Sequence, residues 1–511
     1  MKDKVNFLKK YKVYIWLILI FSLAFFLRTY RLPDIYVFNL DEEHQAEYAW
    51  TIVQNFHIIW IGVASSPLEF YLGPYFTYFT AFWLWISKGD PLITAYIAAL
   101  TGSITSVTIF LVIWRLFNFA AGVVSSALYA TLPLFIFFDQ KYWNPMFVPL
   151  VVVLLYLTLN LVKKSKWWWI LYTILLGVVL NTQLAPLPLF FIGVWLFIRG
   201  NFFKDLKLLF ILLLTFMLFY WPLVVFDFNH NFSNMKAIAP LFNKNTEIKI
   251  VFDPVTKFNS LFDSLGRFWY LNPGIPNSDE INFGCTSLSH ANDFKIIDKY
   301  TQRTRSPLWL SLISAALFIY FYRFVIKRKN SALNLLAVFY LVFFTFFLIY
   351  PGGAFEYYYL GFLTLFTFIP GILVANANRH RLLLFVIICT VILFGVNTIL
   401  RTSDEFSLRP KKLLIKQVMD IIGKEPFSID GRGICHNYEG WRYLFKIYGR
   451  LPEQSYSDRL YGWIYTKEIT DKQPVYTVIL SEDRIPLAED LTSLPSIKVG
   501  GYRAYIKKNI L

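Results

Sequence analysis

The chain has 511 residues, of which 56% are hydrophobic and only 16% are charged, whereas soluble domains carry about 25% charged residues. Apolar runs of about 20 residues, the length that crosses a bilayer, recur along the chain, so the composition excludes a soluble globular protein and predicts an all-α polytopic protein of the cell membrane. The formal net charge of +16 is interpreted as the excess of Lys and Arg in cytoplasmic loops, and not as a surface for nucleic acid.

The amino-terminal segment sets the predicted topology. "MKDKVNFLKKYK" is basic and is expected in the cytoplasm, so the first predicted span, about 13–31, carries the chain outward. The segment "FNLDEEHQAEYAW" follows, with three consecutive carboxylates at 41–43. Because acidic residues favour the first turn of a helix, a helix is predicted to begin there on the outer face.

The segment 68–87 is apolar but is not predicted to cross the membrane. If it crossed, the basic runs "KKSK" (163–166) and "KRKN" (327–330) would both lie outside, against the positive-inside bias. The Gly73-Pro74 break leaves about 14 residues, or roughly 21 Å of helix, against a hydrocarbon core of ~30 Å. We therefore interpret it as an interfacial or re-entrant helix on the outer face.

With that segment outside, about eleven spans are predicted, with the amino terminus inside and the carboxyl terminus outside. The fifth and sixth are separated by the turn-forming sequence "NTQLAPLP". The predicted spans are about 13–31, 91–114, 119–138, 145–162, 167–184, 186–200, 206–226, 307–326, 331–350, 356–376 and 381–401.

Three regions are predicted on the outer face: the loops 32–90 and 227–306 and the tail 402–511. Within the second loop, apolar residues of "FNSLFDSLGRFWYL" repeat at helical spacing, which is typical of an interfacial helix. In the tail, "PKKLLIKQVMDII" predicts a helix, "PVYTVIL" a buried strand and "SIKVGGYRAYIKK" a final strand. The prediction is thus a transmembrane domain over 1–401 and a small α/β extracytoplasmic domain over 402–511.

Polar side chains gather at the outer ends of the predicted spans, whereas the span interiors are nearly free of ionisable residues. Ion-coupled transporters usually carry such groups near the midplane, so the pattern favours a site at the outer membrane surface, open to lipid and to water. The polar residues concerned are Asp41, Glu42, His44, Glu69, Asp139, Lys141, Asn144, Gln183, Asp227, His230 and Glu356.

These segments resemble the GT-C glycosyltransferases, in the branch of protein O-mannosyltransferases and lipid A aminoarabinose transferases. "RLPDIYVFNLDEEHQAEYAW" is similar to the first outer loop of that branch, where an Asp-Glu pair follows span one and opens a helix. "DQKYWNPMFVPLVVVLLYLTL" resembles its second outer motif, a basic residue followed by Asn-Pro, and "GVVLNTQLAPLPLF" and "WPLVVFDFNHNF" resemble later span-end motifs. The match covers about the first 235 residues in register, and the span layout extends it to about Arg401.

The resemblance implies a GT-C fold and transfer of a sugar, with inversion, from a polyprenyl phosphate to an acceptor at the outer face. It implies that Asp41 is the general base for an acceptor hydroxyl, and that Glu42 orients Asp41, binds the acceptor or holds a cation. The implied groups around the donor phosphate and substrate are Lys141, Asn144, His230, Asp227, Gln183, Glu69 and His44.

The same residues have structural interpretations that stay open at this point. Acids at 41–43 favour a helix start by themselves, and Asn144 before Pro145 is a good helix-start pair. Departures from the branch pattern, such as Ser65-Ser66 in place of a basic residue, leave a divalent cation open. The sugar is open as well, and so is the acceptor, which is a protein, a glycolipid or a glycan.

Two other functions are compatible with a polytopic protein of this composition. One is a lipid or polysaccharide flippase, which needs a polar path that the uncharged spans do not offer. The other is a polysaccharide polymerase or ligase of another transferase architecture. A bridge between Cys285 and Cys435 is also left open, because the spacing of the cysteines does not decide it.

Overall fold

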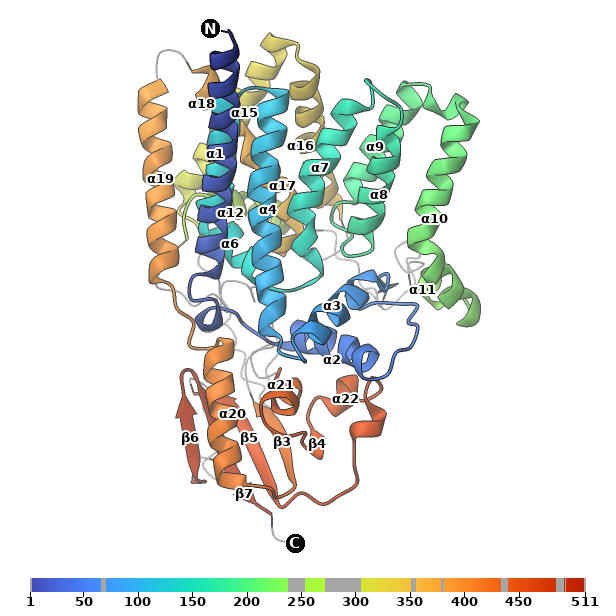
Figure 1. The fold of residues 1–511 in the computed structure, drawn as a ribbon, viewed down its shortest axis with the longest axis vertical. Coiled ribbons are helices and arrows are strands. Elements are labelled where there is room, and N and C mark those ends of the chain that lie inside the picture. The colour runs from blue at the N-terminus through green and yellow to red at the C-terminus, as the bar shows by residue number, and fades with distance from the viewer. Residues whose placement is uncertain are drawn as a thin grey trace.

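The computed structural model shows a bundle of long helices standing above a small sheet region, with the amino terminus at one end and the carboxyl terminus at the other (Figure 1). It describes residues 2–65, 70–237, 253–271, 305–350, 355–377, 381–432, 440–483, 491 and 493–509. The predictions for Glu69 and for a Cys285–Cys435 bridge lie outside the described residues.

The bundle is built from apolar helices that follow the predicted spans. They are α1 (Lys2–Thr29), α4 (Leu92–Leu116), α5 (Phe119–Thr131), α6 (Pro133–Gln140), α7 (Val148–Leu161), α8 (Trp168–Leu180), α9 (Leu187–Arg199), α10 (Leu206–Asn229), α15 (Leu308–Arg328), α16 (Ser331–Ile349), α17 (Leu360–Phe366), α18 (Phe368–Asn376) and α19 (Arg381–Arg401). Short 3-10 helices lie at several ends: η1 (Leu32–Asp34), η2 (Asn144–Phe147), η3 (Phe202–Lys204) and η5 (Glu356–Tyr359).

The described part of the chain contains eight helical segments long and apolar enough to cross a membrane. The pair α5 and α6, bent by 58° where Pro133 begins α6, makes a ninth. The remaining two predicted spans coincide with α8 and α9, which have 13 residues each and are shorter than a usual span. The multi-pass architecture is confirmed, and the count of eleven stays a prediction.

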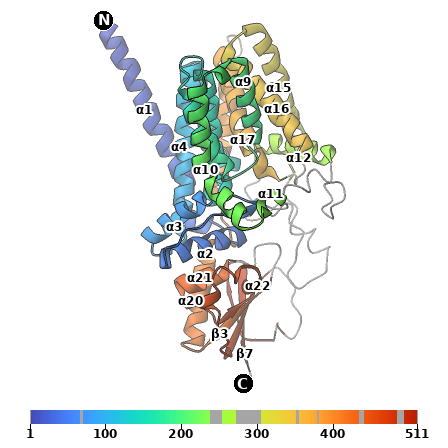
Figure 2. The same cartoon turned by 90° about the vertical axis from the view of Figure 1, so that its right-hand side faces the viewer.

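Two helices lie across one end of the bundle instead of along it (Figures 1 and 2). They are α2 (Leu40–Gln54) and α3 (Tyr75–Ile86), which pack against each other. The 12 residues of α3 are not among the candidate spans of the described chain, in agreement with the interpretation of 68–87. A Cβ at Gly73 would overlap the side-chain oxygen of Asn181, so only glycine allows the chain before α3 to approach the α8–α9 turn.

The loops rich in Lys and Arg lie at the end of the bundle that carries the amino terminus. These are the α7–α8, α9–α10 and α15–α16 connections, all drawn at the top of Figure 1. The acidic helix α2 and the sheet lie at the opposite end. This separation is what the positive-inside rule requires if the α2 end is extracytoplasmic, and that orientation stays a prediction.

The C-terminal region, residues 402–509, forms a five-stranded mixed sheet of order β4-β3-β5-β7-β6. The strands are β3 (Phe427–Arg432), β4 (Gln454–Ser455), β5 (Tyr476–Glu482), β6 (Ser496–Val499) and β7 (Tyr502–Lys508), with helices α20 (Leu408–Ile422), α21 (Trp441–Tyr448) and α22 (Asp458–Tyr461). The predicted helix and buried strand correspond to α20 and β5. The predicted single last strand is wrong, because Gly500-Gly501 turns it into the β6–β7 hairpin.

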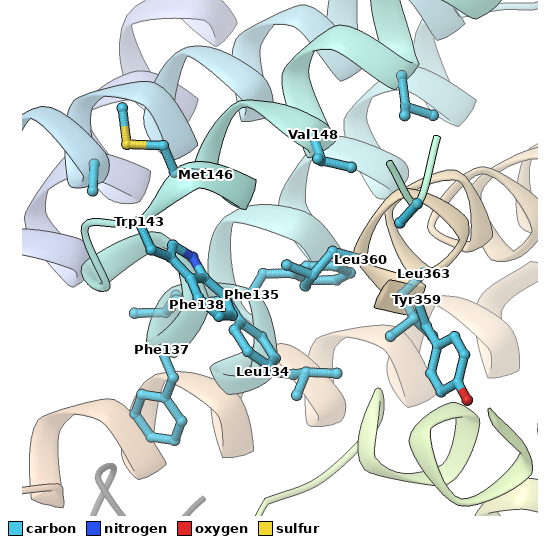
Figure 3. Packing of buried hydrophobic residues seen from close by; sticks show 14 of the residues in the cluster. Leu134, Phe135, Phe137, Phe138, Trp143, Met146, Val148, Tyr359, Leu360 and Leu363 are labelled. Carbon is cyan, nitrogen blue, oxygen red and sulfur yellow. The ribbon is translucent and has the colours of Figure 1, made fainter. Parts of the chain in front are cut away.

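The foot of the bundle is a tightly packed aromatic layer (Figure 3). Helix α6 is buried along its whole length. Phe138 stacks on Trp143 with ring centres 5.8 Å apart, and Phe135 meets Phe268 at 5.8 Å. Phe268 follows α12 (Pro254–Arg267), the helix predicted from the interfacial pattern. This layer fixes the short segment between α6 and η2, which carries Lys141.

Candidate active site

The acidic helix α2 begins with a capping box. Oε2 of Glu42 accepts a hydrogen bond from the backbone N–H of Asn39 at 3.1 Å, and the Asn39 side chain caps the helix in return. The two hydrogen bonds satisfy backbone N–H groups that have no partner inside the helix, which explains why Asn39 and Glu42 occupy the start of α2. The capping box also holds the Glu42 carboxylate in one place, so that its second oxygen, Oε1, points away from the helix backbone.

Lys141 lies between the first two carboxylates. Its Nζ is 3.4 Å from Oε1 of Glu42 and 3.8 Å from Oδ2 of Asp41. The Glu42 side chain is 1% exposed and that of Lys141 is 11% exposed, whereas that of Asp41 is 60% exposed. The ammonium of Lys141 also lies 4.9 Å from the ring centre of Trp143. Asp41 is therefore the carboxylate of the trio that a substrate reaches from solvent.

The pKa values of the two inner groups are both raised, but for different reasons. It raises the pKa of Glu42, and the positive charge of Lys141 offsets this only in part. Burial lowers the pKa of Lys141, but the charges of Glu42 and Asp41 outweigh it and hold the pKa above its usual value. Lys141 is accordingly a permanent ammonium at neutral pH, already paired with two carboxylates.

The third and fourth acids of α2 point the other way, toward the C-terminal region. Glu43 is fully buried and accepts hydrogen bonds from the backbone N–H groups of Gly440 and Tyr443, at 3.0 and 3.1 Å. Glu47 is also fully buried and pairs with Arg442 and Lys446. The acids of this helix therefore serve two different neighbours, one on each side.

Two predicted residues next to the trio have structural partners. His44 stacks on Tyr461 at 4.6 Å, and burial lowers the pKa of His44 from 6.5 to about 4, so it is neutral at physiological pH. Asp139 is buried and pairs with Arg28 of α1, with Oδ2 2.7 Å from Nη2. Asn144 is the first residue of η2 and lies three positions after Lys141.

The other predicted residues lie on a different side of the bundle. Asp227 accepts a hydrogen bond from the backbone N–H of Asn234 at 2.7 Å, and His230 stacks on Phe226 at 4.1 Å. Both are at the lower end of α10, toward the opposite edge of the bundle from α6 in Figure 1. Gln183, in the α8–α9 turn, accepts a hydrogen bond from the N–H of Leu184. The structure does not bring these three to Lys141.

An apolar cavity of about 220 Å³ opens on that side, between the α8–α9 turn, α10 and the chain before α3. Its walls suit a hydrocarbon chain. The lining residues are Phe70, Leu72, Gly73, Leu180, Leu184, Leu187, Phe190, Phe216, Tyr220 and Leu223.

Lys257 is a candidate that the sequence analysis missed. It lies on α12, is 5% exposed, and its Nζ has no hydrogen-bond partner among the described residues. The ring of Tyr350 lies 5.8 Å away, and burial lowers the pKa of Lys257 although the charge of Asp253 opposes this. A lysine in an amphipathic helix is expected to face solvent, so the sequence pattern did not indicate that Lys257 is buried. A buried ammonium without an acid partner fits an anion that binds from outside the chain.

Among the residues that the structure describes, no group of three His, Cys, Asp or Glu side chains is placed to hold a metal ion. The space between the Asp41 and Glu42 carboxylates is taken by the ammonium of Lys141.

No family model matches the sequence, and no curated protein matches it. Solved structures do. The apo state of ArnT from Cupriavidus metallidurans has a TM-score of 0.58 and 10% identity, covering 96% of this chain and 97% of that one. The same protein bound to undecaprenyl phosphate has a TM-score of 0.56 and 10% identity, covering 96% and 98%. The archaeal oligosaccharyltransferase AglB from Archaeoglobus fulgidus, in complex with an inhibitory peptide and a dolichol-phosphate, has a TM-score of 0.49 and 12% identity, covering 93% and 70%.

Proposed function

Because the chain has the GT-C fold of ArnT, we propose that it is a membrane glycosyltransferase that moves a sugar from a polyprenyl phosphate to an acceptor. The observation that carries the proposal is the trio at the foot of the bundle, in which an exposed Asp41 stands beside the buried pair of Glu42 and Lys141. The comparison structure was solved with undecaprenyl phosphate, which supports a lipid-linked donor.

Asp41 acts as the general base. Its exposed carboxylate takes the proton of an acceptor hydroxyl while the hydroxyl oxygen attacks the anomeric carbon of the sugar. The bond from that carbon to the phosphate oxygen breaks, and the electron pair leaves on the lipid phosphate. Attack from the face opposite the phosphate inverts the anomeric centre. The leaving group is already an anion and needs a cation or N–H donors rather than an acid.

Glu42 and Lys141 position the base. The capping hydrogen bond fixes Glu42, Glu42 holds Lys141, and the ammonium of Lys141 lies within reach of Asp41. Because Glu42 and Lys141 are buried, their interaction is little screened by salt. The pair therefore restricts where the Asp41 carboxylate sits.

Two lysines are candidates for the donor phosphate. The sequence resemblance assigns it to Lys141, whose charge is already balanced by two carboxylates. Lys257 carries a buried charge without an acid partner in the described chain, on a helix whose end packs against α6. We therefore propose that Lys257 binds the donor phosphate and that Lys141 holds the carboxylates of Asp41 and Glu42 in place. Asn144 stays proposed as a neutral donor, and Glu69 and His44 as substrate contacts. His230, Asp227 and Gln183 lie on another side of the bundle and are not assigned to this site.

The surroundings of the site suit its substrates. The proposed orientation places α2 and the C-terminal region outside the cell, where a hydroxyl of a protein, glycolipid or glycan serves as acceptor. A sheet region below α2 and an apolar bundle above it give the site one aqueous and one lipid face (Figure 2).

The test is transfer by the purified full-length protein in nanodiscs. Radiolabelled polyprenyl-phosphate sugars of several kinds are supplied with serine and threonine peptides, glycolipids and cell-wall glycans. Transfer or release of label by the wild type is expected with at least one donor. No release with any donor, from a protein that binds undecaprenyl phosphate, would overturn the proposal.

A further inference from the structure

Helix α2 is held from two sides. On one side Asp41 and Glu42 meet Lys141 of the bundle. On the other, Glu43 caps the start of α21 through the N–H groups of Gly440 and Tyr443. The residue that contacts the C-terminal region, Glu43, directly follows the two that contact the bundle, so the two sets of contacts cannot move independently on a rigid helix.

A network of charged side chains around the buried Glu47 and Arg442 fastens the middle of α2. Glu47 contacts Arg442 and also Lys446, the latter at 3.2 Å. The same two cations hold Glu468, at 2.8 and 2.6 Å. Arg442 also lies over the ring of Tyr465 at 3.3 Å. Because Glu47 and Arg442 are almost fully buried, leaving either without its partner is strongly disfavoured, so the pair tolerates little change in geometry.

A second contact fixes the start of α2. Lys411 of α20 is fully buried and donates hydrogen bonds to the backbone oxygen of Phe38 at 2.7 Å and to Oδ1 of Asn39 at 3.2 Å. Asn39 is the capping residue of α2. Gly440 (φ 85°) lies so close that a Cβ there would overlap the Phe38 oxygen. The C-terminal region therefore contacts Phe38 and Asn39, the two residues that precede helix α2.

We infer that the C-terminal region is a clamp for the active site, and that Glu47, Glu43 and Lys411 are positioning residues for Asp41. The inference rests on the proposed function for the identity of the base. The contacts of α2 with the C-terminal region determine where Asp41 and Glu42 lie relative to Lys141. Misplacing a catalytic group by about 1 Å can cost on the order of 100-fold in rate.

The main variant is Glu47→Gln, which removes one charge and keeps the shape. Arg442 and Lys446 retain Glu468, so the C-terminal region keeps a paired network and is expected to fold. The matched control is Asp483→Asn. Asp483 also contacts one arginine and one lysine, Arg503 and Lys498, but these belong to the β6–β7 hairpin and are not among the contacts that hold α2. Where Glu47→Gln folds poorly, Lys411→Met makes the same test, since it keeps the apolar stem.

Two measurements on full-length protein in nanodiscs decide the matter. Amide hydrogen exchange over 40–54 is expected to rise in Glu47→Gln and to stay at the wild-type level in Asp483→Asn. The kcat of sugar transfer is expected to fall about 10- to 100-fold in Glu47→Gln, with undecaprenyl phosphate affinity unchanged.

The outcomes separate this inference from the proposed function. Unchanged exchange in Glu47→Gln overturns the clamp, and so does faster exchange with an undiminished kcat. A wild-type protein without transferase activity overturns the proposed function instead, and the exchange comparison then decides alone whether the C-terminal region holds α2.

Discussion

Nζ of Lys141 lies 3.4 Å from Oε1 of Glu42, although Lys141 directly follows α6 and Glu42 stands on α2, almost a hundred positions earlier in the chain. The contact joins the acidic helix at the surface to the buried end of α6. Both side chains are largely shielded from solvent, so water does not compete with Glu42 for the ammonium of Lys141. The bundle and the acidic helix therefore form one unit at this point, and the predictions below start from it.

The roles of Lys257 and Lys141 are distinguished by substituting each with methionine, which keeps the apolar part of the side chain. Lys257→Met is expected to weaken binding of undecaprenyl phosphate about tenfold or more, because it removes a buried cation that has no acid partner in the described chain. Lys141→Met is expected to lower kcat and leave this affinity within about threefold. Binding is measured in nanodiscs with labelled lipid phosphate. The reverse pattern would return the donor phosphate to Lys141.

The pair of Arg28 and Asp139 is expected to support folding rather than catalysis. Asp139→Ala leaves the Arg28 guanidinium buried without its carboxylate, which typically costs about 3–5 kcal/mol. The protein should show a lower thermal midpoint and a poor folded yield in detergent. Asp205→Asn is the control, because it removes an ion pair with Lys166 at an exposed loop while asparagine can still cap the start of α10. Equal midpoints for the two variants would contradict the structural role.

The elements of the bundle were predictable because their signals are local. Runs of apolar residues and their charged flanks are read directly from neighbouring positions, so the predicted spans coincide with helices. The amphipathic spacing of α12 and α20 is equally local. The sequence predicts one strand across Gly500-Gly501, but the positive φ of Gly500 makes a turn there and divides it into β6 and β7.

The site was predictable only in part, because its contacts are not local. The acids of α2 stand out as a cluster, but Glu43 points away from the other two. That it faces Tyr443, 400 residues later, is not visible in the sequence. Asp227 and His230 lie near the end of a predicted span, as Lys141 does, but their helix is α10. Which ends of a bundle converge depends on helix packing and not on the pattern along one helix.

His44 makes the stability of the protein depend on pH. Its pKa in the folded state is about 4, against 6.5 for a free histidine, so folding favours the neutral ring. The stabilisation is complete above pH 6.5 and is lost as the pH falls from 6.5 toward 4. It amounts to up to roughly 3 kcal/mol. His44→Phe keeps a ring stacked on Tyr461 and cannot titrate.

The thermal midpoint is measured at pH 7.5 and pH 5 for both proteins. The wild type is expected to lose more than His44→Phe between these values. Parallel losses would mean that His44 is hydrated or that its proton is shared, and would remove it as the source of the pH dependence.

Asp41→Asn is the sharpest test of the mechanism. Asparagine keeps the size of the side chain and the helix start, so the capping interpretation of this acid expects nearly normal activity. The general-base mechanism expects kcat to fall about 10²–10⁴-fold, because the amide cannot take the proton of the acceptor. The fold should be unaffected, since the Asp41 side chain is exposed and the buried Glu42 still holds Lys141.

Glu43→Gln is the companion variant, because it changes the adjacent acid and spares the base. Each of the two carboxylate oxygens of Glu43 accepts a hydrogen bond from one backbone N–H group of the C-terminal region. Glutamine has only one oxygen, so one of these N–H groups loses its acceptor. We expect a lower thermal midpoint and a loss of kcat smaller than that of Asp41→Asn. Transfer rates of the wild type and the two variants are compared at equal amounts of folded protein. If Asp41→Asn retains most of its activity while Glu43→Gln loses it, the carboxylates of α2 hold the C-terminal region in place, and the base must be sought elsewhere.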